Sequence, residues 1–276
     1  MKILGYGDRV PRGTFELHSA FESAINFRGR GGFLISLVNR KTGNGPMNIV
    51  LKHLPHGARR LKVTKLNLYI DENCLEADPD KNYDSSVPLL PLDTVLFREN
   101  LRIFRDFLGA EAAPKSMCFL FACSAEGAFK TVFERKMLES MKKAVRLLET
   151  GDYARGARSL RGLGFGLTPS GNDFLCGYLT GLSFMDANLS VGLDPIMDAV
   201  YDNAVTKNLI VNSYTYCAYN GRVNEKTRKL LAALAGFDEK RLFAAAKAAL
   251  KSGHTSGADF CAGLVYGCDT ALKDRN

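Results

Sequence analysis

The stretch Gly162-Leu-Gly-Phe-Gly-Leu-Thr-Pro-Ser-Gly-Asn-Asp-Phe-Leu-Cys-Gly177 decides how the second half of this chain is expected to fold. Its alternate glycines predict a tight loop, and the apolar run that begins at Phe174 predicts a helix. Ser170 and Asp173 have the S-x-x-D spacing of a capping box, in which each side chain pairs with the other residue's amide. Unpaired amides and the positive end of the helix dipole gather at such a start, so the stretch predicts an anion site.

A second stretch, Ser252-Gly-His-Thr-Ser-Gly-Ala-Asp-Phe-Cys-Ala-Gly263, repeats the first one. The repeat aligns Ser170 with Ser256, Gly171 with Gly257, Asp173 with Asp259, Phe174 with Phe260, Gly177 with Gly263 and Gly181 with Gly267. Identities at matching offsets indicate two copies of one local structure.

The paired glycines of each copy lie one helical turn apart. An interior helix glycine costs about 1 kcal/mol relative to alanine, so close approach of another helix is the simplest reason for keeping it. We therefore expect the two helices to cross through their glycine faces. This packing explains Gly177, Gly181, Gly263 and Gly267, but it does not require the polar residues ahead of each helix.

The rest of the chain predicts an α+β fold, with a β-rich basic domain at 1–115 and a mainly helical domain at 116–276 that carries both motifs. The expected strands are 33–38, 47–51 and 61–70, with a hairpin turn at 41–46 and a solvated acidic connection at 71–84. The expected helices are 91–108, 129–148, 153–160, 172–185, 195–220, 224–235, 239–251 and 257–272, while 117–122 fits either a strand or a short helix.

Composition places the chain among ordinary globular proteins. It has 276 residues, 46% of them apolar, and seven cysteines without a C-x-x-C pair. We expect these cysteines to be reduced, and we expect no metal site and no cofactor. No apolar run is long enough to span a membrane, and the first residues lack a signal peptide's apolar region, so a cytoplasmic location is expected.

Positive charge is concentrated early in the chain. The net charge is +8, and residues 1–70 contain twelve Lys or Arg but three Asp or Glu. Such a region is open to an acidic partner subunit, an anionic substrate or plain solvation. No basic run interleaved with aromatic residues accompanies it, so we expect no nucleic-acid binding. The turn at 28–32 places Arg28 beside flexible backbone, where it is a candidate anion clamp.

The residues ahead of the two helices are candidates for chemistry. Small or hydroxyl-bearing residues there suit a small anion, and His254 suits proton transfer. Asp173 and Asp259 would repel an anion unless they cap the helices, hold a cation or orient a donor. The sequence leaves these three alternatives open.

Together the two stretches resemble the motifs of a bacterial domain-of-unknown-function family. Its better-understood members are described as a subunit of oxamate carbamoyltransferase, a transferase of anaerobic allantoin breakdown and hence of purine catabolism. Residues 24–27 and 45–46 also fit the family. Its pattern usually has two aspartates where this chain has Asn172 and Asp173.

The resemblance implies small anionic substrates of the carbamoyl phosphate and oxamate type, and additional protein subunits. On this basis the expected catalytic residues are His254, Asp173 and Asp259. The expected substrate-binding residues are Gly164, Gly166, Thr168, Ser170, Gly171, Asn172, Thr255, Ser256, Gly257, Asn26 and Arg28. The alternative is a non-catalytic scaffold subunit whose basic domain docks an acidic partner.

Overall fold

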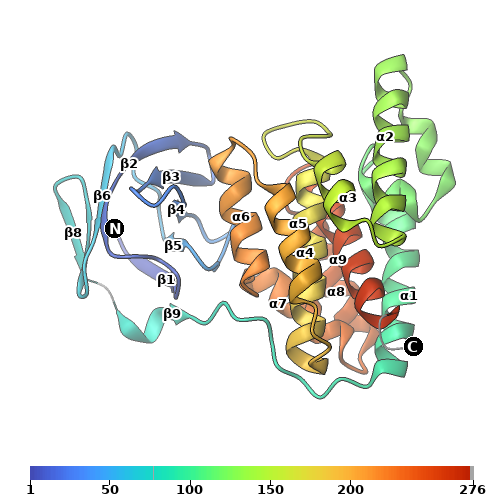
Figure 1. Ribbon diagram of the computed structural model, residues 1–276. Helices are drawn as coiled ribbons and strands as arrows, with labels where there is room; N and C mark the ends of the chain where they lie inside the picture. Colours follow the sequence, from blue (N-terminus) through green and yellow to red (C-terminus); the bar gives the residue numbers. More distant parts are fainter. Residues whose placement is uncertain (77, 274–276) are drawn as a thin grey trace. The chain divides into compact units, whose positions relative to one another are not determined.

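A computed structural model describes residues 1–76 and 78–273 (Figure 1). The fold is α+β: a curled nine-stranded sheet at the N-terminus is followed by a helical region. Residue 77 of the expected acidic connection and residues 274–276 of the expected helical domain lie outside the described residues.

By contacts, the chain forms two compact units. The β unit comprises Met1–Ser86 with Arg222–Glu225, and the helical unit comprises Val87–Gly221 with Lys226–Asn276. Helix α1 (Thr94–Glu111), which our sequence-based boundary placed with the strands, belongs to the helical unit. The reason is that its apolar side packs against the last two helices of the chain.

The sheet of the β unit has the strand order β8-β7-β6-β2-β3-β4-β5-β1-β9. Its strands are β1 (Ile3–Gly7), β2 (Gly13–Ala20), β3 (Ala24–Arg28), β4 (Leu34–Val38), β5 (Asn48–Leu51), β6 (Arg60–Val63), β7 (Asn67–Ile70), β8 (Asn73–Glu76) and β9 (Asn82–Tyr83). The curled sheet encloses its own apolar core, in which Phe27, Leu37 and Ile49 are fully buried.

Three strand predictions are corrected. The expected strand 61–70 is a hairpin of β6 and β7, because Thr64 bonds to Asn67 through both its backbone amide and its hydroxyl and turns the chain. The expected hairpin at 41–46 instead links β4 to β5, which pair in parallel. The connection at 71–84 also contains β8 and β9, because both strands pair with the sheet edges.

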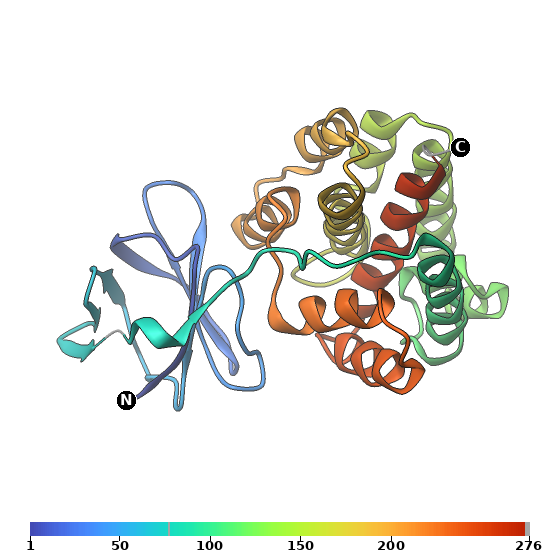
Figure 2. The ribbon, with the colours of Figure 1, turned by 90° about the horizontal axis from the view of Figure 1, so that it is seen from below.

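The helical unit contains α1 and eight further α-helices in its described part. They are α2 (Val132–Glu149), α3 (Tyr153–Leu160), α4 (Ser170–Leu189), α5 (Asp194–Ala204), α6 (Leu209–Tyr219), α7 (Glu225–Leu234), α8 (Glu239–Leu250) and α9 (Ser256–Lys273). The 3₁₀ helices η2 (Met117–Leu120) and η3 (Cys123–Ala128) precede α2. Helices α4 and α9 lie side by side inside the bundle (Figures 1 and 2).

Two expectations about the helices change. The single helix expected over 195–220 is broken into α5 and α6, because the Asn208 side chain accepts from the amides of Ile210 and Val211 and starts a new helix. The segment 117–122 fitted either a strand or a short helix, and its residues 117–120 form η2.

The expected glycine crossing of α4 and α9 is confirmed. A Cβ atom added at Gly177 would lie 1.9 Å from the carbonyl oxygen of Phe260, and one added at Gly263 would lie 1.9 Å from that of Phe174. One helical turn further on, an added Cβ atom would lie 2.6 Å from a carbonyl oxygen of the other helix at Gly181 and 2.2 Å from one at Gly267. The two backbones are therefore in direct contact, which only glycine permits.

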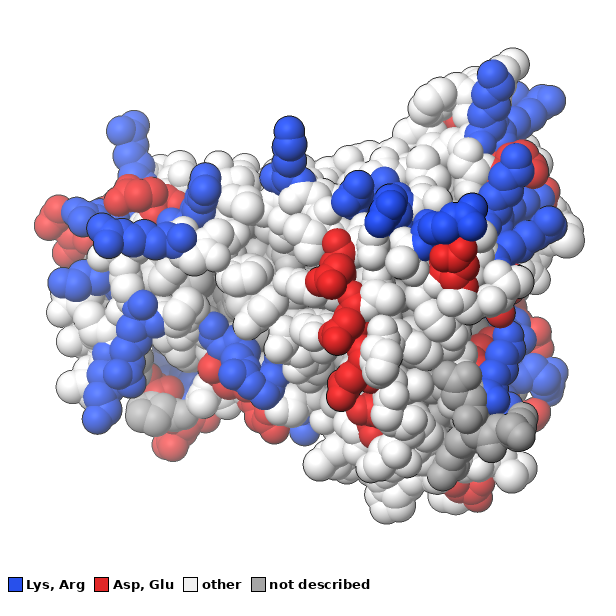
Figure 3. All heavy atoms as spheres, viewed as in Figure 1, with Lys and Arg blue, Asp and Glu red and all other residues white. Residues whose placement is uncertain are grey.

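Charged side chains lie on the surface of both units. All twelve Lys and Arg of residues 1–70 are exposed, so the positive charge of the β unit is solvated. In the helical unit, Asp194, Asp198 and Asp202 are exposed at every fourth position of α5, and Figure 3 shows a column of acidic side chains on one face of the protein. Among the described residues, no helix combines the length and apolar character that a membrane crossing requires.

Replacing Gly263 by Ala tests the helix crossing. We expect Gly263→Ala to lower the free energy of unfolding by about 3 kcal/mol, since its Cβ would collide with the backbone of α4. Gly109→Ala, inside α1, is the matched control: its Cβ would meet ordinary contacts at 3.5 Å, so higher helix propensity should stabilise the protein by up to about 1 kcal/mol. Urea titrations that give both variants the same sign of change would contradict the crossing.

Candidate functional site

The two motifs form matching structures at the starts of α4 and α9. The amide of Gly171 donates to the carbonyl of Leu163 at 2.8 Å, and the amide of Gly257 donates to that of Ser252 at 2.8 Å. In each copy the glycine also abuts the end of the preceding helix, where a Cβ would meet a backbone oxygen at 2.0 Å or 2.3 Å. The expectation of two copies of one local structure is confirmed. These two amides are already paired and are not free donors.

The predicted capping box is wrong in both copies. The N-cap of α4 is Pro169, whose carbonyl accepts from the amide of Asp173 at 3.1 Å. In α9 the carbonyl of Thr255 accepts a hydrogen bond from the amide of Asp259 at 2.9 Å. Backbone carbonyls therefore satisfy the amides that the serines were expected to cap. The polar side chains of each helix start are left to interact with the other helix.

A chain of hydroxyl groups joins the two motifs. Thr168 donates from Oγ1 to Oδ2 of Asp173 at 3.0 Å, and its Oγ1 lies 3.1 Å from Oγ of Ser256. Either hydroxyl can be the donor in the contact between Thr168 and Ser256. The first motif and the start of α9 thus meet within hydrogen-bond distance.

Asp259 is the most deeply buried polar residue of the site, with 0% of its surface exposed. Its Oδ1 accepts from the backbone amide of Met117 in η2 at 2.6 Å, and its Oδ2 is buried without a hydrogen bond. Burial raises the pKa of Asp259 to about 6, while the Met117 amide and the hydroxyls of Ser170 and Thr255 lower it in part. Desolvation outweighs these donors.

Asp173 is half-buried and lies close to Asp259. Burial raises the pKa of Asp173 to about 7; the hydroxyls of Ser256 and Thr168 lower it in part, and the charge of Asp259 raises it further. A carboxyl group with a pKa near neutrality exchanges a proton readily, which is what general acid–base chemistry needs. Among the described residues, no three His, Cys, Asp or Glu side chains cluster as a metal site would require.

The remaining motif residues divide between structural roles and the surface. Gly164 has a φ of +121°, and a Cβ there would strike the amide of Ser170 at 2.3 Å. Gly166 lies in the exposed loop with a φ of +84°. His254 is exposed in the turn before α9, next to half-buried Thr255.

Asn172 is buried, and both the oxygen and the nitrogen of its side-chain amide make hydrogen bonds. Its Oδ1 accepts from the amide of Gly162 at 2.8 Å, and its Nδ2 donates to the carbonyl of Ala204 at 3.3 Å. An aspartate at this position could make the first bond but not the second. The asparagine therefore fits its surroundings as a structural residue.

Asn26 and Arg28 both lie on β3. Asn26 is buried, donates to Oγ of Ser19 at 3.0 Å and accepts from Oγ of Ser36 at 2.7 Å. Its amide thus links neighbouring strands. Arg28 is exposed at the end of the strand. Asn26 and Arg28 belong to the β unit, whereas the hydroxyl and carboxyl groups just described belong to the helical unit. The role of these two residues in substrate binding stays a prediction.

Sequence reasoning missed two neighbours of the carboxyl pair. Met117 reaches Asp259 through its backbone amide, for which no side-chain pattern gives a signal. Cys176 lies one helical turn after Asp173, and its thiol donates to the carbonyl of Tyr214 at 3.5 Å. Burial, and then the charge of Asp173, raises the pKa of Cys176. The three-residue spacing on α4 is the signal that places this thiol beside the carboxyl group.

Comparison with known proteins gives two family matches. The family described as "Oxamate carbamoyltransferase subunit AllH" matches residues 160–268, which include both glycine motifs, and the "AllH family N-terminal domain" matches residues 5–82. Together the matches cover more than half of the chain. No curated protein and no solved structure matches it significantly.

The raised pKa of Asp173 predicts an unusual pH dependence of stability. Between about pH 4 and pH 7 the folded protein binds more protons at this group than the unfolded chain, so stability should fall as pH rises. At about 1.4 kcal/mol per pKa unit, the loss should be on the order of 4 kcal/mol. Urea titrations across this range should show that Asp173→Asn removes much of the slope, whereas Asp202→Asn, on the exposed face of α5, keeps it. Parallel curves for wild type and Asp173→Asn would contradict the raised pKa.

Proposed function

The chain belongs to the AllH family of oxamate carbamoyltransferase subunits, and from this we propose that it binds the enzyme's small substrates where α4 and α9 begin. The family places it in allantoin degradation, and its description as a subunit implies other protein subunits. The observation that carries the proposal is the hydrogen-bonded chain from Ser256 through Thr168 to Asp173, which joins both motifs at one point.

The polar groups at this point suit the substrates of carbamoyl transfer. Oxamate and carbamoyl phosphate are anions that also carry an NH₂ group. Two helix N-termini supply about half a positive charge each, which favours the anionic part. The hydroxyl oxygens of Ser256 and Thr168 and the carboxylate of Asp173 are the acceptors available to the NH₂ group.

Asp173 fits the proton transfer that the reaction needs. Transfer forms a bond between the carbamoyl carbon and the oxamate nitrogen, breaks the bond from that carbon to the phosphate oxygen, and releases one proton from nitrogen. The phosphate leaves with the electron pair. Asp173, with its pKa raised by burial to about 7, is the proposed acceptor of the proton.

The other two proposed catalytic residues, Asp259 and His254, assist this proton transfer in different ways. Asp259 is proposed to act through its negative charge, which helps keep the pKa of Asp173 high. His254 is exposed in the turn immediately before α9. We propose that it exchanges the proton with solvent or with the departing phosphate. The glycines, Ser170, Asn172 and Thr255 shape the two loops that carry these groups.

A scaffold role is the second candidate, and a specific observation favours it. The amides of Gly171 and Gly257 are paired, Asn172 is saturated by backbone bonds, and Asp259 holds η2 through Met117. Each of these contacts stabilises the fold without a ligand. On this account the motifs assemble a rigid subunit, and partner subunits perform the chemistry.

Activity of the assembled enzyme separates the two candidates. With the chain in complex with its partner subunits, phosphate release from carbamoyl phosphate in the presence of oxamate should fall about a hundredfold in kcat for Asp173→Asn. Its melting temperature at about pH 8 should stay unchanged or rise, because a costly buried charge is removed. Asp202→Asn is the matched control and should keep full activity.

The opposite pattern would support the scaffold role. In that case Asp173→Asn would leave kcat and its pH profile unchanged in complexes of normal composition. A complex that fails to assemble with Asp173→Asn would likewise assign the residue to structure, provided that the isolated variant remains folded.

A further inference from the structure

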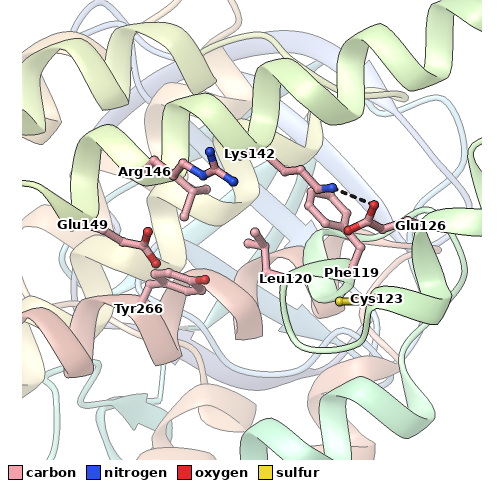
Figure 4. Close-up of a pocket in the computed structure, with 9 residues that line it drawn as sticks. Phe119, Leu120, Cys123, Glu126, Lys142, Arg146, Glu149 and Tyr266 are labelled. Carbon is pink, nitrogen blue, oxygen red and sulfur yellow. Dashed lines mark hydrogen bonds and ion pairs between the residues drawn. The ribbon is translucent and has the colours of Figure 1, made fainter.

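A pocket of about 260 Å³ opens between α2, α9 and the segment of η2 and η3. It is separate from the residues of the proposed substrate site. The lining residues are Phe119, Leu120, Cys123, Glu126, Lys142, Val145, Arg146, Glu149 and Tyr266. Figure 4 shows Lys142, Arg146 and Glu149 of α2 around the pocket, with Glu126 of η3 joined to Lys142 and Tyr266 of α9 beside Glu149.

One half of the charged lining is already paired. The Nζ atom of Lys142 lies 2.6 Å from Oε2 of Glu126 and 3.6 Å from Oε1 of Glu139. These contacts hold η3 against α2 and neutralise the Lys142 end of the pocket. The remaining charged side chains that line the pocket are those of Arg146 and Glu149.

Arg146 and Glu149 stand three residues apart on α2 but do not pair with each other. Within the described part of the chain, the Arg146 side chain makes no hydrogen bond or ion pair, and no ion pair involves Glu149. An i,i+3 arginine and glutamate normally approach each other. Here the guanidinium and the carboxylate lie at different parts of the hollow in Figure 4, so both remain available to a ligand.

Tyr266 adds a phenol group beside Glu149 (Figure 4). Burial, next the negative charge of Glu149, and to a smaller extent a hydrogen bond to Glu149 raise the pKa of Tyr266, so its phenol stays protonated, and the other lone pairs of Glu149 remain for a ligand. The ring packs against Phe121 and Phe174 at centroid distances of 5.9 Å and 5.6 Å and is held in place. The pocket therefore combines a fixed phenol, an apolar floor, one free cation and one anion.

We propose that this pocket binds a small carboxylate that also carries an N–H group. Its carboxylate would lie on the guanidinium of Arg146, which pairs with planar carboxylates through two parallel hydrogen bonds. Its amino or amide N–H would donate to Glu149, and its carbon body would cover Leu120 and Val145. A ligand with only one of the two charges leaves the other group unmatched.

Cys123 provides a local measurement of occupancy. Its thiol lines the pocket and is exposed. In a Cys74→Ser background it is the remaining exposed thiol among the described residues. The rate of its reaction with a thiol reagent would be measured at constant ionic strength with glycine, oxamate or acetate. Glycine carries an amino group, oxamate an amide, and acetate neither.

The binding of an N–H carboxylate should slow the reaction of Cys123 saturably. At a concentration about ten times Kd, glycine or oxamate should slow it about tenfold, and acetate should be less effective. A lower Kd for glycine would identify the ligand as an amino carboxylate, and a lower Kd for oxamate would identify it as an amide carboxylate. Arg146→Gln should abolish protection by all three probes. Glu149→Gln should remove the preference over acetate while leaving protection by acetate.

Two controls tie the effect to the pocket. Arg135→Gln lies on the same helix outside this pocket and should behave as wild type. Asp173→Asn should also leave protection unchanged, which separates this inference from the proposed substrate site. Protection that survives Arg146→Gln would overturn the proposal. So would the absence of saturable protection up to about 50 mM, above the millimolar Kd expected of such small ligands.

Discussion

Direct backbone contact between α4 and α9 is the constraint on which the helical unit depends. Helices with ordinary side chains at their interface pack with axes about 8–10 Å apart. At this crossing, four glycines leave no side chain between the two backbones, and each glycine faces a carbonyl of the other helix. This geometry brings both helix starts to one point, so the loops that precede them meet as well. Any side chain at the crossing would separate the loops and disperse the hydroxyl and carboxyl groups they carry.

Close packing also sets the chemistry of the two aspartates. One helical turn before the first glycine of each crossing pair, Asp259 is completely buried and Asp173 is partly so. Their donors are one backbone amide and a few hydroxyls, which compensate for only part of the lost solvation. Such a pair costs folding free energy at neutral pH. Retaining groups that destabilise the fold is typical of functional sites, and it is the physical reason to look for chemistry at this point rather than in the glycines themselves.

The sequence predicted the crossing because glycine spacing and an internal repeat are properties of the chain itself. It did not predict the hydrogen-bond partners of the polar groups in the two motifs. The capping box failed because the carbonyls of Pro169 and Thr255 compete for the same amides, and side-chain spacing carries no information on that competition. The Met117 amide reaches Asp259 across 142 positions of sequence, a contact that only the tertiary fold creates.

Strand direction was beyond sequence reasoning for a similar reason. The Gly- and Asn-rich turn after β4 is compatible with a hairpin, yet β5 runs parallel to β4 and antiparallel to β1, its other neighbour in the sheet. In the helical unit, the apolar pattern of 195–220 continues through the break before Asn208, so periodicity alone gave one helix. The turn-forming residues Thr206 and Asn208 were the available signal, since their side chains bond to the local backbone.

The central claim is that Asp173 holds an exchangeable proton near neutral pH at the junction of the two motifs. The most direct test is a ¹³C NMR titration of the aspartate side-chain carboxyl carbons, with the Asp173 signal assigned by its absence from Asp173→Asn. The account predicts a midpoint near 7 for this carbon, as burial raises its pKa to about 7, with a second inflection as Asp259 titrates. A midpoint near 4, the ordinary value of an exposed aspartate, would contradict it.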